Sequence, residues 1–97
     1  MIELINREQF EKAIERAKAE RKNLLVQITE RTRQYRVINR RSNQIYVVTF
    51  HVSGNGRRFG NCTCQAGTNG LICKHIAAAA GLNICLAAQG RLIQKCV

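Results

Sequence analysis

The chain begins with an amphipathic helical pattern. Its apolar positions repeat at the three- and four-residue spacing of one helix face and are Phe10, Ala13, Ile14 and Ala17. Asn6 with Gln9 three residues later is a typical helix start, and Ile5 is placed to pack on Phe10 across it. The pattern predicts a helix over residues 7–22 that docks on the domain by a narrow apolar edge. A second interpretation, in which this helix binds a partner or a second copy of the chain, stays open.

Four β-rich runs follow the helix, separated by polar or glycine-containing segments, at 24–29, 34–39, 44–52 and 57–62. Apolar and polar residues alternate in the third run, which defines its inward face. Glycine and asparagine in the 53–56 segment tolerate the positive φ of a tight hairpin. We therefore expect an antiparallel meander whose 30–33 and 53–56 turns lie at one end and whose 40–43 turn lies at the other.

The run from Ile76 to Gln89 is rich in alanine and other helix formers, with Gly90 as a candidate C-cap. The 97 residues suffice for one modest core and exclude a large barrel or a doubly wound sheet. We therefore expect a single domain over residues 1–97.

Charge is distributed unevenly along the chain. All six acidic residues lie in the first 30, where six basic residues balance them. Residues 31–97 contain ten basic residues and no acid, so the net charge of +10 belongs entirely to this segment. A basic excess of this kind favours polyanionic partners, nucleic acid first. The ten residues are Arg31, Arg33, Arg36, Arg40, Arg41, Arg57, Arg58, Lys74, Arg91 and Lys95.

The N-terminus is charged by its third residue and has no apolar signal-peptide core. The longest apolar stretch, 76–88, is interrupted by Gly81 and Asn83 and is shorter than the roughly 20 residues that a membrane span requires. We expect an intracellular protein, cytoplasmic or nuclear, with no membrane partner. In a reducing compartment, five cysteines favour metal ligands or free thiols over disulfides.

The strongest chemical signal is the segment CTCQAGTNGLICKH. It places four metal donors within 14 residues, as a Cys-x-Cys pair, eight intervening residues and a Cys-x-His pair: Cys62, Cys64, Cys73 and His75. Zinc prefers four such donors in a tetrahedron, and a complete set leaves no position for a reacting water. We expect one structural zinc ion per chain. Cys73 should precede the helix or occupy its first turn, with His75 just inside, because residues two apart in a regular helix point about 200° apart.

Three other interpretations of this segment are weaker. The paired spacing argues against scattered, inert buried cysteines. Iron–sulfur clusters take four cysteines, or two cysteines and two histidines, which this set does not match. A catalytic cysteine–histidine pair fails because no acid follows Glu30 to orient the imidazole. We therefore expect no enzyme and no small-molecule substrate.

Residues outside the motif carry weaker expectations. Cys85 is interpreted as a packing residue of the C-terminal helix and Cys96 as a tail thiol. His51 is expected to be a core or surface histidine, because the ligand set is complete without it. The aromatic residues fall in periodic positions and should mostly be core, with Tyr35 and Tyr46 as candidates for a stacking face.

The order of the ligands resembles the SWIM-type zinc finger. The resemblance covers residues 34–88 and rests on the Cys-x-Cys, spacer, Cys-x-His pattern, preceded by a β-rich chain with Tyr35 and Val37 and followed by an apolar helix. It implies that the four matching positions bind zinc within a ββα-like unit. Family members are linked to DNA binding and to protein–protein contact, usually within larger proteins. The expected fold is α+β: an N-terminal helix, a small antiparallel meander and a zinc knuckle leading into the C-terminal helix.

Two functions follow from these patterns, and in both of them zinc only stabilises the fold. The first is binding of nucleic acid, DNA rather than RNA, through phosphate contacts with little base readout. The meander places the basic candidates in two groups, namely Arg31, Arg33, Arg57 and Arg58 at the far end, and Arg40, Arg41 and Lys74 beside the zinc. The alternative is an adaptor or inhibitor that docks on an acidic protein partner or forms a homodimer. A continuous basic stripe favours the first function, and dispersed arginines favour the second.

Overall fold

The computed structural model describes residues 2–89 and confirms the α+β architecture. Its elements in chain order are β1 (Ile2–Glu3), α1 (Arg7–Ala19), β2 (Leu24–Ile28), β3 (Gln34–Asn39), β4 (Gln44–Val52), β5 (Arg58–Cys62), α2 (Gln65–Thr68) and α3 (Lys74–Ala88). The candidate C-cap Gly90 lies outside the described residues, as do Arg91, Lys95 and Cys96.

The strands form one antiparallel sheet in the order β1-β5-β4-β3-β2. The meander from β2 to β5 was expected, and the strand directions place the 30–33 and 53–56 turns at one end and the 40–43 turn at the other. Gly56 adopts a φ of +84° in the hairpin that follows β4, a conformation that favours glycine. The two-residue β1 was not expected, because a pairing this short has no periodic pattern.

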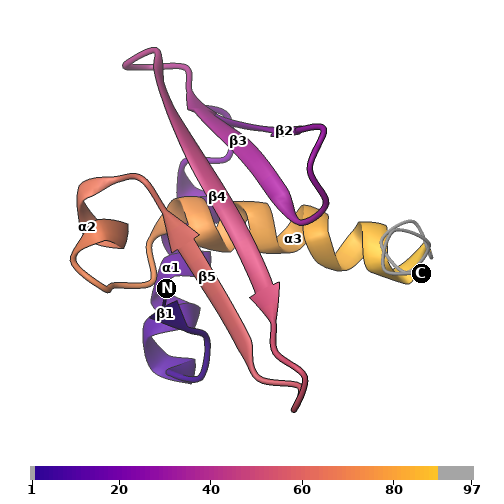
Figure 1. Cartoon of the computed structure of the whole chain (residues 1–97). Coiled ribbons are helices and arrows are strands. Elements are labelled where there is room, and N and C mark those ends of the chain that lie inside the picture. The colour runs from indigo at the N-terminus through magenta and orange to yellow at the C-terminus, as the bar shows by residue number, and fades with distance from the viewer. Residues whose placement is uncertain (1, 90–97) are drawn as a thin grey trace.

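Both long helices lie on one face of the sheet (Figure 1). α3 crosses behind the strands, and α1 packs beside it. The core between these layers is built from Tyr35, Val37, Val48 and Phe50 of the sheet, Ile76, Ala79 and Ala80 of α3, and Ala13 of α1. The phenol of Tyr35 donates a hydrogen bond to Asn83 Oδ1 at 2.6 Å, which ties β3 to α3. None of the helices within residues 2–89 is long and apolar enough to cross a membrane.

The N-terminal helix starts where the sequence predicts and ends earlier. The amide of Gln9 donates to Asn6 Oδ1 at 3.0 Å, which confirms the N-cap. The helix ends at Ala19 rather than at residue 22, because the chain turns at Glu20 toward β2.

The expected packing of Ile5 on Phe10 is wrong. The amide of Leu4 donates to the carbonyl of Arg58 at 2.9 Å, which holds Leu4 against the sheet beside Gly60. Ile5 then points to solvent and is 73% exposed.

Candidate metal centre

The Cys-x-Cys pair comes from the end of β5 and the turn that follows it. Cys62 is the last residue of β5 and lies opposite Val48, where both side chains are buried in the core. Cys64 has left the strand and caps the N-terminus of α2, where its Sγ accepts a hydrogen bond from the amide of Gly67 at 3.3 Å. Side chains two residues apart in an extended chain point the same way, so both sulfurs lie on one side.

Gly67 allows this turn to fold back tightly on the strand. A Cβ at this position would lie 2.4 Å from the carbonyl oxygen of Cys62 and 2.8 Å from the Cys62 Cβ. Real Cβ atoms do not approach other atoms this closely. The tight turn brings Cys64 back beside Cys62. The sequence pattern does not predict α2, because one turn of helix is too short to show a period.

The Cys-x-His pair lies at the start of α3, as expected. Cys73 is the N-cap, and its Sγ accepts a hydrogen bond from the amide of Ile76 at 3.5 Å. The positive end of the helix dipole favours a thiolate at this position. His75 is the second residue of the helix, and its ring stacks on that of Tyr46 with centroids 4.2 Å apart. Tyr46 therefore orients the imidazole.

The four donor side chains converge. Neither ring nitrogen of His75 has a hydrogen-bond partner among the described residues, although both are buried. Such unsatisfied polar atoms are costly and require an explanation. One ligand atom from each of Cys62, Cys64, Cys73 and His75 lies within 4.8 Å of all the others, and all four residues are buried. Zn–S bonds of about 2.3 Å put neighbouring sulfurs roughly 3.8 Å apart in a tetrahedron, so the cluster fits zinc in donor type, number and span.

The three thiols perturb one another's pKa because they share a buried site. The hydrogen bond between Cys62 and Cys73 holds the pKa of the Cys62 thiol far above its usual range. The same hydrogen bond lowers the pKa of Cys73 to about 4. Burial raises the pKa of Cys64. These shifts favour the thiolate at Cys73 and the thiol at Cys62 and Cys64, and a bound divalent cation favours ionisation of all three.

Comparison with protein-family models identifies this segment. Residues 46–82 match the SWIM zinc finger. They form a SWIM zinc finger domain. The domain begins at Tyr46 in β4, ends at Leu82 in α3 and contains all four ligands. Its Cys3His cluster is consistent with a single zinc ion coordinated by these four residues, as the sequence predicts.

The SWIM finger occupies the central part of the range 34–88 over which the resemblance extends. Comparisons with curated proteins and with solved structures found no match to the chain. β1, α1, β2 and β3 lie outside the SWIM finger.

Seven basic residues were predicted to contact nucleic acid, and two of them form ion pairs with acidic residues of the N-terminal segment. Arg57 donates to both carboxylate oxygens of Glu3, from Nε at 2.7 Å and from Nη2, and these bonds lower the pKa of Glu3. The Lys74 ammonium pairs with Glu20 at 2.7 Å. Both pairs join residues far apart in the sequence, so the local excess of basic residues does not reveal them.

Arg40 and Arg41 lie in the β3–β4 turn. Val48 of β4 pairs with the ligand Cys62, and β4 begins four residues before Val48. The turn that precedes β4 therefore projects past the metal cluster (Figure 1). Within residues 2–89, no hydrogen bond or ion pair joins either arginine to Lys74. At the other end of the sheet, the chain places Arg31 and Arg33 in the β2–β3 turn and Arg58 at the start of β5.

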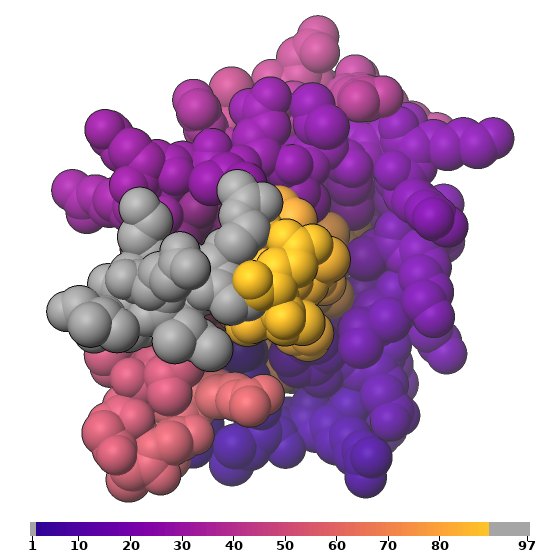
Figure 2. Space-filling view, turned by 90° about the vertical axis from the view of Figure 1, so that its right-hand side faces the viewer, coloured from indigo at the N-terminus to yellow at the C-terminus, as the bar shows by residue number. Residues whose placement is uncertain are grey.

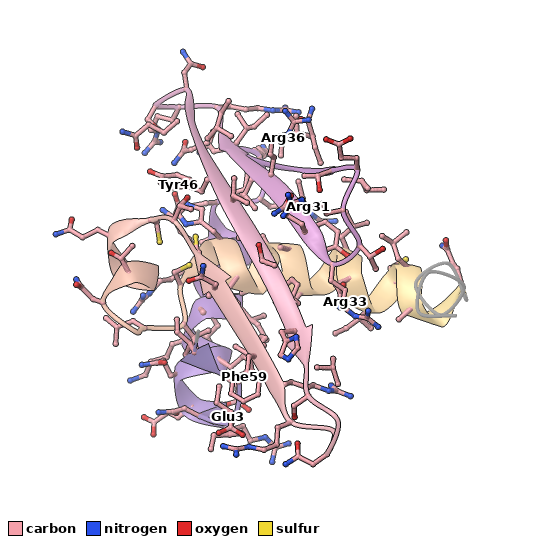
Figure 3. All side chains as sticks on the ribbon, in the orientation of Figure 1. Glu3, Arg31, Arg33, Arg36, Tyr46 and Phe59 are labelled. Carbon is pink, nitrogen blue, oxygen red and sulfur yellow. The ribbon has the colours of Figure 1, made fainter. Side chains whose placement is uncertain are left out.

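Figure 3 shows Arg36 on β3, with Arg31 and Arg33 in the turn that precedes this strand. Arg36 is exposed and alternates with the buried Tyr35 and Val37, so its side chain lies on the face of the sheet opposite the helices. It was counted among the basic residues of the sequence but was not selected as a binding residue. The alternation of buried and polar positions in β3 is the signal that marks it.

Two other side chains can now be placed. Tyr35 is 1% exposed, so it is a core residue, as expected for most of the aromatic residues, and it does not offer a stacking face. The thiol of Cys85 is exposed and does not pack in the core. The accessible aromatic surface comes instead from Phe59, which lies opposite His51 with ring centroids 6.1 Å apart and was not predicted. His51 is exposed and takes no part in the metal cluster.

We expect zinc binding to weaken steeply as pH falls. The raised pKa values of Cys62 and Cys64 keep both thiols protonated near neutral pH, so each zinc bound must release at least two protons. Lowering the pH by one unit should then weaken zinc binding about 100-fold or more. Competition with a chromogenic chelator at two pH values measures this slope. A loss of only about tenfold would mean that a single thiol is protonated in the metal-free protein.

Proposed function

We propose that the SWIM finger is a structural centre supporting a nucleic-acid-binding surface, and that the chain binds DNA mainly through its phosphates without acting as an enzyme. The observation that carries this proposal is the convergence of Arg31 and Arg36 on one hollow of the sheet face that no described helix covers. Four protein ligands complete the zinc coordination, which supports a structural rather than a catalytic role for the metal.

The hollow has a volume of about 410 Å³ and is lined by Ile28, Thr29, Glu30, Arg31, Gln34, Arg36 and Val47. Two arginines and one acidic residue, Glu30, therefore line the hollow. Arginine suits this task because its planar fork binds phosphate oxygens in pairs and keeps its charge at any physiological pH. A phosphate held between Arg31 and Arg36 supports a backbone contact that does not depend on base sequence.

The surroundings of the hollow support the same partner. Phe59 and His51 lie on the same open face, and the Arg57 guanidinium is 5.6 Å from the centroid of the Phe59 ring. Basic side chains beside accessible aromatic rings are typical of nucleic-acid-binding surfaces. Arg40 and Arg41 extend the positive charge along the projecting turn. The acids of α1 lie on the helical side, where Glu8 and Glu11 pair with basic residues of their own helix.

We expect affinity for a fluorescent DNA duplex to fall steeply with salt. If about four phosphates are contacted, log K should fall against log salt with a slope near roughly −3.6, a loss of about 150-fold from about 50 to 200 mM salt. Replacing Arg31 and Arg36 together by alanine should make the slope shallower by up to roughly two units and cut that loss to about 12-fold. All sequences should be affected alike, because phosphate contacts do not read bases.

The matched control replaces Arg7 and Lys12 of α1 by alanine, which removes the same net charge from side chains already paired with Glu11 and Glu8. This variant should keep nearly the full salt slope. Single-stranded DNA and RNA of the same length are titrated in parallel. If the folded, zinc-loaded protein bound none of the three polymers at low salt, the nucleic-acid proposal would be wrong.

A further inference from the structure

An apolar groove runs between α1 and β2, with α3 as its floor. It has a volume of about 570 Å³ and is lined mainly by apolar residues of the three elements, among them Ile14, Leu24, Val26 and Ala80. Figure 2 looks toward the C-terminal end of α3, in yellow, with the violet and indigo N-terminal half of the chain beside it. The small side chains of alanines and Gly81 in α3 form the floor and leave room above it. Ile84 at its end is 63% exposed, although it is apolar.

One wall of the groove is an open edge of the sheet. β2 is the last strand in the order and, in the described part of the chain, pairs with β3 alone. The backbone carbonyl of Asn23 accepts a hydrogen bond from the amide of Arg40, and the amide of Thr29 donates to the carbonyl of Gln34. Backbone hydrogen bonds in an antiparallel pair involve every second residue, so the odd-numbered residues of β2 are the ones bonded to β3. The backbone groups of the even-numbered residues, Leu24, Val26 and Ile28, therefore point outward, and within residues 2–89 no other element pairs with them. Such an edge is a template for an added strand.

The groove is positively charged at one end. Lys18 and Arg21 line it where α1 leads into β2, and among the described residues no acid lines it. The nearest acid in sequence, Glu20, is held by Lys74. A ligand that fills the groove must therefore combine apolar side chains with negative charge.

We propose that an extended peptide of another protein pairs with the outer edge of β2, places alternate apolar side chains in the groove, and sets an acidic residue beside Lys18 and Arg21. Hydrogen bonds to the edge supply affinity, and the groove selects every second side chain because side chains alternate along a strand. Charge complementarity favours this partner over a second copy of the chain, since Lys18 and Arg21 suit an acidic ligand and two copies repel each other at a net charge of +10 each. The groove lies on the helical side of the sheet, so the inference does not depend on the nucleic-acid proposal.

The test pans a displayed library of random dodecapeptides against the zinc-loaded protein. Enriched sequences should carry aliphatic residues at alternate positions with aspartate or glutamate at one end. One enriched peptide is then synthesised with a fluorescent label, and its affinity for the full chain is measured by anisotropy.

Three variants locate the binding site. Gly81→Leu fills the groove without disturbing the core, because a Cβ at Gly81 meets no atom within 4 Å, and it should weaken peptide binding by about tenfold or more. Val26→Pro removes an amide that points away from β3, so it blocks strand addition while sparing the sheet.

Lys18→Glu with Arg21→Glu should weaken peptide binding by about tenfold or more. The matched control is Lys12→Glu with Arg16→Glu, an equal charge change on residues of the same helix that do not line the groove, and it should leave peptide binding unchanged.

The proposal is overturned if the library yields no enriched sequence, or if Gly81→Leu leaves the affinity of the enriched peptide unchanged. Sedimentation of the protein without peptide tests whether a second copy of the chain binds at the β2 edge. A dimer that Val26→Pro dissociates would assign the edge to self-association instead. Duplex binding measured on the same variants should stay at the wild-type level for Gly81→Leu, which separates this result from the outcome of the nucleic-acid test.

Discussion

Replacing Cys64 by serine is expected to unfold the SWIM finger rather than to weaken one of its activities. Its sulfur is one of four buried ligands and also caps α2, so its loss removes a metal ligand and a helix cap together. Metal-coupled folding in small fingers contributes on the order of 10–16 kcal/mol near neutral pH. This is comparable to or larger than the roughly 5–15 kcal/mol net stability of a typical domain. Circular dichroism and thermal melting, with zinc content measured alongside, should report the loss of the folded C-terminal half.

Cys85→Ser is the matched control, because the Cys85 thiol is exposed and lies outside the cluster. It should retain one zinc and melt within a few degrees of the parent protein. A strong chelator added to the parent protein should reproduce the unfolding of Cys64→Ser. Unchanged melting after complete removal of zinc would show that the centre does not hold the fold together.

Gly67→Ala is expected to destabilise the domain by about 3 kcal/mol or more, at the upper end of the range for overpacked sites. The new methyl group would lie 2.4 Å from the Cys62 carbonyl oxygen, and neither that backbone nor the helical turn can move without displacing the Cys62 or Cys64 sulfur. Zinc affinity should fall together with stability. Equilibrium urea denaturation at a fixed zinc concentration measures the first effect, and chelator competition measures the second.

Gly81→Ala adds the same methyl group and is expected to have the opposite effect on stability. Its Cβ meets no atom within 4 Å and lies in the middle of α3, so alanine should stabilise the helix by up to about 1 kcal/mol. If both substitutions stabilised the protein, the close approach of Gly67 to Cys62 would be wrong.

The strands could be predicted from the sequence because each is long enough to show its own period. The runs predicted at 34–39 and 44–52 coincide with β3 and β4, and the other two agree within one residue. The short elements could not be predicted in this way. β1 forms only because β5 offers Gly60 and Phe59 as pairing partners, and α2 forms because Gly67 permits a turn tight enough to return Cys64 to Cys62.

The end of α1 was set by the turn into β2. Local composition favours continuation to residue 22, since Arg21 and Lys22 are good helix formers. Instead the chain turns at Glu20, whose carboxylate binds Lys74 at the start of α3. Helix propensity is worth only tenths of a kcal/mol per residue, so a turn that packs the next strand decides where the helix stops.

The metal centre was determined by the sequence itself, because its four ligands lie within 14 residues and coordination chemistry selects them by type and number. The sequence itself did not determine which charges are paired, since Arg57 pairs with Glu3 and Lys74 with Glu20 only after the sheet and helices have formed. The Arg31–Arg36 hollow and the groove beside β2 likewise combine residues of several elements. Ligand spacing is a local property that the order of residues encodes directly. The surfaces that remain exposed depend on which faces the packing of α1, α3 and the sheet has already buried.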